Sequence, residues 1–344
     1  MVTEQTGYVF DPVFLQHDLE GHPESAKRLI SIQTKLESSS VIPELKKINS
    51  RPASAEEISV CHSVDYISKV ETICTKGGGY LDQDTYTNNF SYKAAKVAVG
   101  SLIDLTDAVI DHKIKNGFAF LRPPGHHALE NRAMGFCIFG NVAIAAKTAL
   151  NNPSIKKVAI VDIDVHHGNG TQALVGDNPA ILFISTHQFP FYPGTGAINE
   201  TGTGDASGTM INIPLDPYTS DKSFKIIYDE IVFPAIWRFK PDIIFVSAGY
   251  DAHWDDPLAN MGLSLTGYSW ISKSLIDAAE KICQGKIIFI LEGGYNLQVL
   301  GTGAINSVKA LLRRSDFEDE LGTSPHKDPA VDKLIKELNN IHSL

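Results

Sequence analysis

Acidic and histidine side chains lie close together at several places in the sequence, in a spacing that suits metal chemistry. Asp164 and His166 are two residues apart, so in an extended segment both would point to one side and could bind the same ion. Asp251 could supply a third ligand from a neighbouring strand end. Two carboxylates and one imidazole leave a fourth position open for water, which is typical of a catalytic rather than a structural zinc site.

The tandem histidines His126 and His127 follow a Pro-Pro-Gly turn and suit acid–base chemistry. A hydrolase must deprotonate the metal-activated water and then protonate the leaving amine. Asp162 is expected to orient one imidazole and keep it charged, whereas Asn169 is a neutral partner for the other. We therefore expect the two pKa values to move apart, as separate acid and base roles require.

Tyr295 follows two glycines, Gly293 and Gly294, directly after an apolar run. The glycines would let the backbone pass close to a metal ion. A tyrosine hydroxyl aimed at the site could hydrogen-bond the substrate carbonyl and the oxyanion that develops from it. The sequence thus offers a third kind of catalytic group beside the ligands and the histidines.

The elements that must position these groups are visible as short apolar runs that alternate with helical periodicity. Strands are expected at 117–121, 158–163, 181–185, 243–247 and 287–291, and helices at 91–112, 141–150, 221–239 and 266–283. This order predicts an α/β fold with a mainly parallel sheet that helices cover on both faces. Because each polar cluster follows a strand, all should meet at the carboxyl edge, where such sheets bind ligands.

No internal repeat or low-complexity linker divides the chain, so we expect residues 1–344 to form one domain. Apolar residues at helical spacing predict an amphipathic C-terminal helix over 331–342. Such a helix would either dock on the body of the domain or contact another subunit in a homo-oligomer.

The formal net charge is −10, which argues against nucleic acid as a direct ligand and is compatible with a cationic substrate. The N-terminus shows no signal peptide, and no apolar run approaches the roughly 20 residues that span a bilayer. The four cysteines form no CxxC pair and are expected to be reduced thiols. We therefore expect a cytoplasmic protein without membrane contact, whose metal ligands are histidine and carboxylates.

These motifs resemble those of the histone deacetylase superfamily, which includes the acetylpolyamine amidohydrolases and the acetoin-utilisation proteins. The matching stretches follow the family's order and span nearly the whole chain. They are HPESAKR at 22–28, LDQDTY at 81–86, RPPGHHA at 122–128, GFCIFGNVAIAA at 135–146, VDIDVHHGNGTQ at 161–172, PFYPGTG at 190–196, VSAGYDAHWDDPL at 246–258 and LEGGYN at 291–296. The resemblance implies the arginase/deacetylase fold, with a central eight-stranded, mainly parallel sheet flanked by helices.

The resemblance also implies one zinc ion held by the three ligands named above. It assigns His127 as general base, His126 as acid or electrostatic partner, and Tyr295 as the group that polarises the scissile carbonyl. Phe136 and Tyr192 match positions whose rings wall an acyl-lysine tunnel.

Further positions follow from the same resemblance. Gly135 matches the backbone position between the tunnel walls, and Asp84 matches a rim carboxylate that binds the substrate backbone. Asn169 stands where one branch of the family has Asp, so the chain looks like the class II branch. Tyr295 places the chain outside the class II subgroup that has histidine there. A structural potassium ion is implied near Asp162, Asp164, His166, Ser185 and Thr186.

The substrate could be an acyl-lysine peptide or protein, or an acetylated polyamine. Polyamine-selective relatives often have glutamate where this chain has Leu258, which offers an apolar wall to a lysine stem, so acyl-lysine is the favoured substrate. Two other functions remain open. A binuclear manganese ureohydrolase could use Asp255 and Asp256 around a second ion, and a non-catalytic protein could bind acyl-lysine without hydrolysing it.

Overall fold

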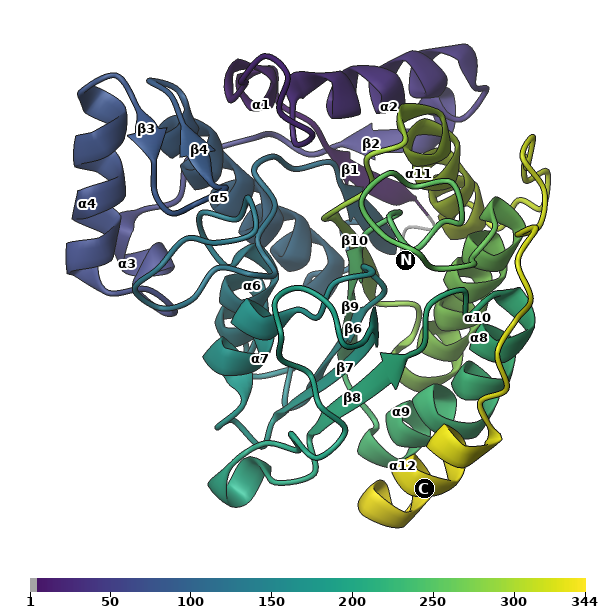
Figure 1. The fold of residues 1–344 in the computed structure, drawn as a ribbon. Helices are drawn as coiled ribbons and strands as arrows, with labels where there is room; N and C mark the ends of the chain where they lie inside the picture. The colour runs from purple at the N-terminus through teal and green to yellow at the C-terminus, as the bar shows by residue number, and fades with distance from the viewer. Residues whose placement is uncertain (1–4) are drawn as a thin grey trace.

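The computed structural model describes residues 5–344, and its centre is one eight-stranded sheet in the order β2-β1-β5-β10-β9-β6-β7-β8 (Figure 1). Every neighbouring pair in this sheet is parallel, so the predicted mainly parallel sheet is confirmed. Its strands are β1 (Thr6–Val9), β2 (Leu45–Lys47), β5 (Asn116–Ala119), β6 (Val158–Asp162), β7 (Ile181–Gln188), β8 (Met210–Leu215), β9 (Ile243–Ala248) and β10 (Ile287–Leu291). A separate antiparallel hairpin pairs β3 (Gly79–Tyr80) with β4 (Tyr86–Thr87).

The central strands are apolar on both faces because helices cover both sides of the sheet. Every residue of β6, β9 and β10 is buried, in agreement with their runs of valine, isoleucine and phenylalanine. The five strands predicted from such runs are all present, with ends shifted by up to three residues. The sequence prediction missed β1, β2 and β8. Both β2 and β8 lie at the edges of the sheet, and the three residues of β2 are not buried.

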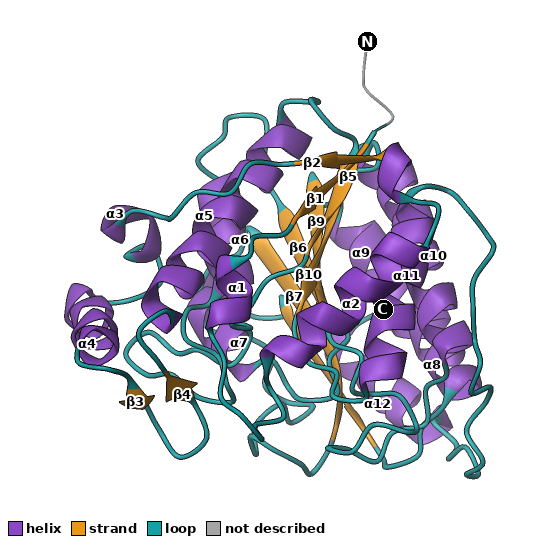
Figure 2. Cartoon of the chain, turned by 90° about the horizontal axis from the view of Figure 1, so that it is seen from above, coloured by secondary structure: helices purple, strands orange, loops and turns teal. Residues whose placement is uncertain are grey.

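Helices lie on the two faces of the sheet in separate groups (Figure 2). One face carries α5 (Ser91–Ile110), α6 (Asn141–Ala149) and α7 (Asn169–Val175), and the other carries α2 (Ala26–Ser38), α8 (Asp221–Ile227), α9 (Phe233–Phe239), α10 (Leu265–Cys283) and α11 (Leu297–Leu311). The remaining α-helices of the first hundred residues are α1 (Val13–Gln16), α3 (Ala55–Ile58) and α4 (Val64–Thr75). No helix within residues 5–344 combines the length and the apolar composition that crossing a membrane requires.

The predicted helix over 221–239 is present, but it is not a regular α-helix throughout. A π-helical turn at Tyr228–Val232 joins α8 to α9. Pro234 stands in the first turn of α9 and has no backbone N–H to donate to the preceding turn. The missing donor explains why the hydrogen-bond pattern changes just before this residue.

The parallel register brings the functional segments to one edge of the sheet. Five consecutive neighbours in the sheet are β5, β10, β9, β6 and β7. A polar cluster predicted above lies at the carboxyl end of each of these strands, either just after the strand or within its last residues. Asp162, at the end of β6, pairs with Ser185 of β7 on one side and with Ser247 of β9 on the other. Parallel pairing of adjacent strands therefore builds the site from five separate parts of the chain.

The C-terminal helix α12 (Asp332–His342) packs on the body of the molecule, the first of the two roles considered for it. Leu338 is completely buried, and Leu334 and Ile335 pack against the central core. Ile341, in contrast, is 39% exposed. The buried side of the helix should therefore carry its contribution to stability.

This difference gives a paired test of α12. We expect Leu338→Ala to lower the free energy of unfolding by about 2 to 5 kcal/mol, because it removes a completely buried side chain. Ile341→Ala should change it by no more than about 0.5 kcal/mol. Urea unfolding followed by circular dichroism measures both, and equal effects of the two substitutions would contradict this packing.

Candidate active site

His126 and His127 lie side by side after β5, and each imidazole has its own orienting partner. The Nδ1 of His126 is 3.1 Å from a carboxylate oxygen of Asp162, and the Nδ1 of His127 is 2.7 Å from the side-chain oxygen of Asn169. The two ring centroids are 4.0 Å apart, and both residues are buried. The structure thus brings together the four residues predicted for acid–base chemistry, with one partner for each histidine, and it assigns Asp162 to His126 and Asn169 to His127.

The surroundings move the pKa values of the two imidazoles in opposite directions. Burial opposes the charged form of His126, but the carboxylates of Asp164 and Asp162 outweigh it and raise the pKa of His126 well above its ordinary value. Burial, helped by the nearby His126 and His166, holds the pKa of His127 well below its ordinary value. These directions agree with the divergence expected from one charged and one neutral partner.

A buried carboxylate that the sequence prediction missed holds the histidine loop in place. One oxygen of Glu292 accepts hydrogen bonds from the backbone N–H groups of Gly125, at 2.8 Å, and His126, at 3.2 Å. Glu292 is completely buried and directly follows β10, next to β5 in the sheet. Its position in the stretch LEGGYN, immediately after an apolar run, was the available signal.

The three predicted metal ligands converge beside these histidines. One ligand atom from each of Asp164, His166 and Asp251 lies within 4.8 Å of the others. The Nδ1 of His166 is 3.1 Å from an oxygen of Asp164 and 3.4 Å from an oxygen of Asp251. Backbone N–H groups hold both carboxylates, because Gly293 donates to Asp164 at 2.8 Å and Val165 donates to Asp251 at 2.9 Å.

This group fits a divalent metal ion in its chemistry and its shape. The Oδ2 of Asp251 is buried and makes no hydrogen bond within residues 5–344, and the Nδ1 of His166 lies 3.4 Å from it, so a cation bound by both groups would offset the cost of burying this carboxylate. A β-carbon at Gly293 would lie 2.0 Å from that oxygen, and one at Gly249 would lie 2.1 Å from Asp164 Oδ2. Zinc binds a ligand set of two carboxylate oxygens and one imidazole nitrogen, and iron and cobalt do so as well.

A cavity of about 190 Å³ opens next to the metal ligands and the histidines. All five residues predicted to bind substrate line it, together with His127, His166 and Tyr295. The five are Asp84, Gly135, Phe136, Tyr192 and Leu258. Phe191 also lines the cavity and stacks on the ring of His166 with centroids 5.5 Å apart. The sequence prediction missed Phe191, although it precedes Tyr192 in the motif PFYPGTG.

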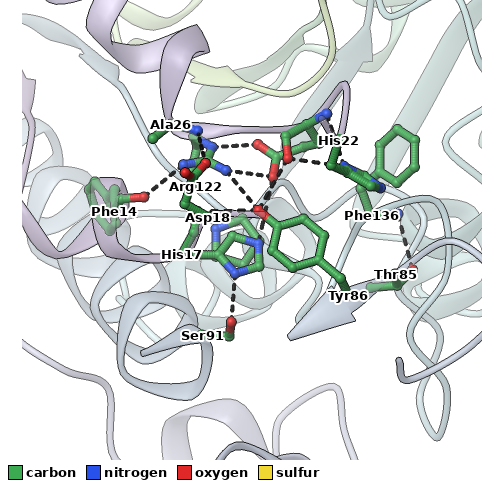
Figure 3. Close-up of polar contacts among 12 residues, drawn as sticks. Phe14, His17, Asp18, His22, Ala26, Thr85, Tyr86, Ser91, Arg122 and Phe136 are labelled. Carbon is green, nitrogen blue, oxygen red and sulfur yellow. Dashed lines mark hydrogen bonds and ion pairs between the residues drawn. The ribbon is translucent and has the colours of Figure 1, made fainter. Parts of the chain in front are cut away.

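Aromatic rings and one tight turn form the cavity wall. Phe136 meets Tyr295 edge to face at 5.9 Å, and Tyr192 meets His127 at 5.3 Å. Gly135 has a φ of +56°, and a β-carbon there would lie 2.3 Å from the His127 ring, so this position requires glycine. The backbone N–H of Phe136 donates to the Thr85 hydroxyl at 3.1 Å (Figure 3).

Asp84 also has a role inside the protein, because its carboxylate accepts a hydrogen bond from the backbone N–H of Gly135 at 3.2 Å.

The loop that carries Tyr295 is likewise held by carboxylates. Asp256 accepts from the backbone N–H of Tyr295 at 2.7 Å, and Asp255 accepts from the side chain of Asn296 at 2.9 Å. Asp255 and Asp256, considered above as ligands of a second ion, are therefore engaged in hydrogen bonds of this loop.

Burial raises the pKa of the Tyr295 hydroxyl well above its usual value, although Arg28 acts in the opposite direction. The hydroxyl therefore keeps its proton at neutral pH and can donate a hydrogen bond.

Ser185 and Thr186, predicted near a potassium ion, lie on β7 beside β6. The Thr186 hydroxyl donates to the backbone oxygen of Asp162 at 3.4 Å, and Ser185 bonds to His187.

Comparison with known proteins decides the family. The family model described as "Histone deacetylase domain" matches residues 22–311. The chain belongs to the histone deacetylase family. Membership places it among hydrolases of the deacetylase class, and the arginase/deacetylase fold implied by the motifs is confirmed.

Relatives from distant organisms support this assignment over almost the full chain. Histone deacetylase 14, chloroplastic, of Arabidopsis thaliana is 39% identical, with 96% of this chain and 83% of that protein covered. A probable deacetylase of Archaeoglobus fulgidus is 35% identical, with 98% of each covered. The crystal structure of the HDA15 HD domain is 36% identical and superposes with a TM-score of 0.90, covering 99% of this chain and 95% of that one.

The close approach at Gly293 yields a test of the metal site. The β-carbon in Gly293→Ala would collide with Asp251 and Asp164 together, so we expect divalent metal affinity to fall by about 10- to 100-fold. Gly208→Ala is the matched control, because Gly208 has a φ of +87° but no atom near the added carbon. Zinc competition with a chromophoric chelator measures both affinities. Equal affinity in Gly293→Ala and in the unchanged protein would show that these carboxylates do not hold the ion.

Proposed function

We propose that the protein is a zinc-dependent deacetylase that removes acetyl or related acyl groups from the ε-amine of lysine in peptides or proteins. The observation that carries this proposal is the cavity. Aromatic and aliphatic side chains form its wall, and it reaches His127, His166 and Tyr295. Such a wall suits the apolar stem of an acylated lysine, and the polar groups suit the hydrolysis of its amide.

Asp164, His166 and Asp251 would hold the zinc ion. When bound, it would supply Lewis acidity that polarises the acyl carbonyl and makes water easier to deprotonate. A structural potassium ion remains part of the proposal, next to Asp162, where hard oxygen ligands gather at the end of β6. The hydrogen bond from the Thr186 hydroxyl to the backbone oxygen of Asp162 supports the proposal, because it brings these two proposed potassium-site residues together.

The two histidines divide the proton transfers in this proposal. Asn169 accepts the Nδ1 proton of His127, so the Nε2 of His127 is left as the basic atom that takes a proton from water. Asp162 keeps His126 protonated, and His126 acts as the acid or as an electrostatic partner of the developing negative charge. The protonated Tyr295 hydroxyl would donate to the carbonyl oxygen as it becomes an oxyanion.

Leu258 favours acyl-lysine over an acetylated polyamine as the substrate. It lines the cavity as an apolar side chain and offers no partner to a second ammonium group. Asp84 at the same cavity would accept backbone N–H groups of a peptide. Leu258 and Asp84 are therefore the two residues that favour a peptide or protein as the substrate of the deacetylase.

The first test of this function combines substrate choice with metal removal. We expect higher kcat/KM for an acetyl-lysine peptide than for N-acetylspermidine, measured by mass spectrometry of the products. Chelation should abolish turnover, and about one equivalent of Zn²⁺ per chain should restore it. Asp251→Ala should lose both bound metal and activity. Full activity of a verified metal-free preparation would contradict the proposal, and a preference for N-acetylspermidine would identify a polyamine deacetylase instead.

A second test separates chemistry from binding. Tyr295→Phe removes only a hydroxyl group, and we expect kcat to fall by roughly 100-fold or more, the scale of losing one oxyanion donor. Binding of a hydroxamate, measured by calorimetry, should survive because the proposed metal ligands are unchanged. A kcat near that of the unchanged protein would mean that Tyr295 is a structural residue.

A further inference from the structure

A carboxylate outside the cavity lies between two buried arginines. Glu24 precedes α2 and is completely buried, as are Arg28 and Arg122. Arg122 donates to both oxygens of Glu24, from Nε to Oε1 and from Nη2 to Oε2, the latter at 2.8 Å. Arg28 donates from Nη1 to the same Oε1 at 3.2 Å. One carboxylate thus joins two guanidinium groups.

Arg122 connects this carboxylate to the loop of the catalytic histidines. It stands four residues before His126, at the start of that loop. Its Nη1 donates to the backbone oxygen of Phe14 at 2.8 Å, and its Nη2 also donates to the hydroxyl of Tyr86 at 3.2 Å. The beginning of the loop is therefore held from several directions by one planar side chain.

Arg28 connects the same carboxylate to the loop of Tyr295. It donates from Nε to the backbone oxygen of Gly294 at 2.8 Å and from Nη2 to the backbone oxygen of Glu292. Its guanidinium carbon lies 5.1 Å from the centre of the Tyr295 ring. The side chain therefore holds the chain on both sides of Gly293 and contacts the proposed oxyanion donor itself.

The same segment also touches the mouth of the cavity. His22, two residues before Glu24, meets the ring of Phe136 edge to face at 4.8 Å, and its Nε2 lies 3.2 Å from the backbone oxygen of Asp84. The hydroxyl of Tyr86 donates to the backbone oxygen of Glu24 at 3.1 Å. Residues around Glu24 thus reach the histidine loop, the tyrosine loop and the cavity wall.

Charge makes this arrangement rigid. Burial alone would raise the pKa of Glu24, but Arg122, His17 and Arg28 lower it to about 2, so the carboxylate remains ionised. Removing one partner of a buried ion pair is costly because a buried charge is left uncompensated. Without the carboxylate, two buried guanidinium groups would face each other, and each could relieve the repulsion only by moving the loop that it holds.

We propose that Glu24 is a positioning residue that fixes the loop of His126 and His127 relative to the loop of Tyr295, through the carboxylate that Arg122 and Arg28 share. This inference rests on the proposed hydrolytic function of the site. Glu24 does not line the cavity, and it acts only through the two arginines. Its contribution should therefore appear in the rate of the chemical step and not in the affinity for metal or substrate.

The experiment is Glu24→Gln in the zinc-loaded protein with an acetyl-lysine peptide. The amide keeps the shape but removes the charge, so we expect kcat to fall on the order of 100-fold, as for a small misplacement of catalytic groups. KM and the zinc content should stay near those of the unchanged protein. In a protein that already carries Tyr295→Phe, Glu24→Gln should lower kcat by less than about a further 3-fold, because the effects of groups that act as a unit are not additive. Wild-type kcat in Glu24→Gln, or an additive double variant, would overturn the inference.

Two controls keep the test decisive. Glu318→Gln also removes a carboxylate partner of a buried cation, Lys309, but away from the cavity, so we expect a lower melting temperature and an unchanged kcat. If Glu24→Gln does not fold, Glu24→Asp keeps the charge but shortens its reach. A folded, zinc-loaded Glu24→Asp with reduced kcat supports the inference, and full kcat overturns it. If the unchanged protein hydrolyses no acyl-lysine, the proposed function fails before Glu24 is tested.

Discussion

Burial of several carboxylates at one edge of the sheet is the constraint on which the rest of the structure depends. Asp162, Asp164, Asp251 and Glu292 are all completely buried there. An isolated buried carboxylate is very costly, so each needs a cation or hydrogen-bond donors. His126 faces Asp162, and backbone N–H groups face one oxygen of Glu292. Asp251 has an oxygen that makes no hydrogen bond within residues 5–344 and lies 3.4 Å from His166, and a metal ion would fit there.

This balance also explains the shape of the chain around the site. The backbone passes so close to the carboxylates of Asp164 and Asp251 that a β-carbon at Gly249 or Gly293 would collide with them, which accounts for glycine at both positions. The positive φ of Gly135 likewise lets the chain turn tightly against His127. Charge and close approach together place the proposed catalytic groups, the proposed metal ligands and the cavity wall within one small volume, as a hydrolase with preorganised polar groups requires.

The network around Glu24 extends the same principle away from the reacting groups. It uses a shared, buried charge to connect two loops that follow neighbouring strands, β5 and β10. The family comparison places this chain among deacetylases, and the stretch HPESAKR at 22–28, one of those that resemble the family, contains both Glu24 and Arg28. In this view the motif contributes to catalysis by fixing the relative position of two loops.

The sequence by itself determined the α/β class, the five central strands and the clusters of His126, Asp164 and Tyr295, because apolar runs and short-range spacing are local properties. Parallel connections then required these clusters to share one edge. Only the tertiary structure decided that Phe191 joins the wall, that Glu292 holds the histidine loop, and which oxygens each donor meets. Those contacts join residues distant in the chain, such as Arg28 and Gly294, and they depend on strand order and packing, which no local pattern of the sequence records.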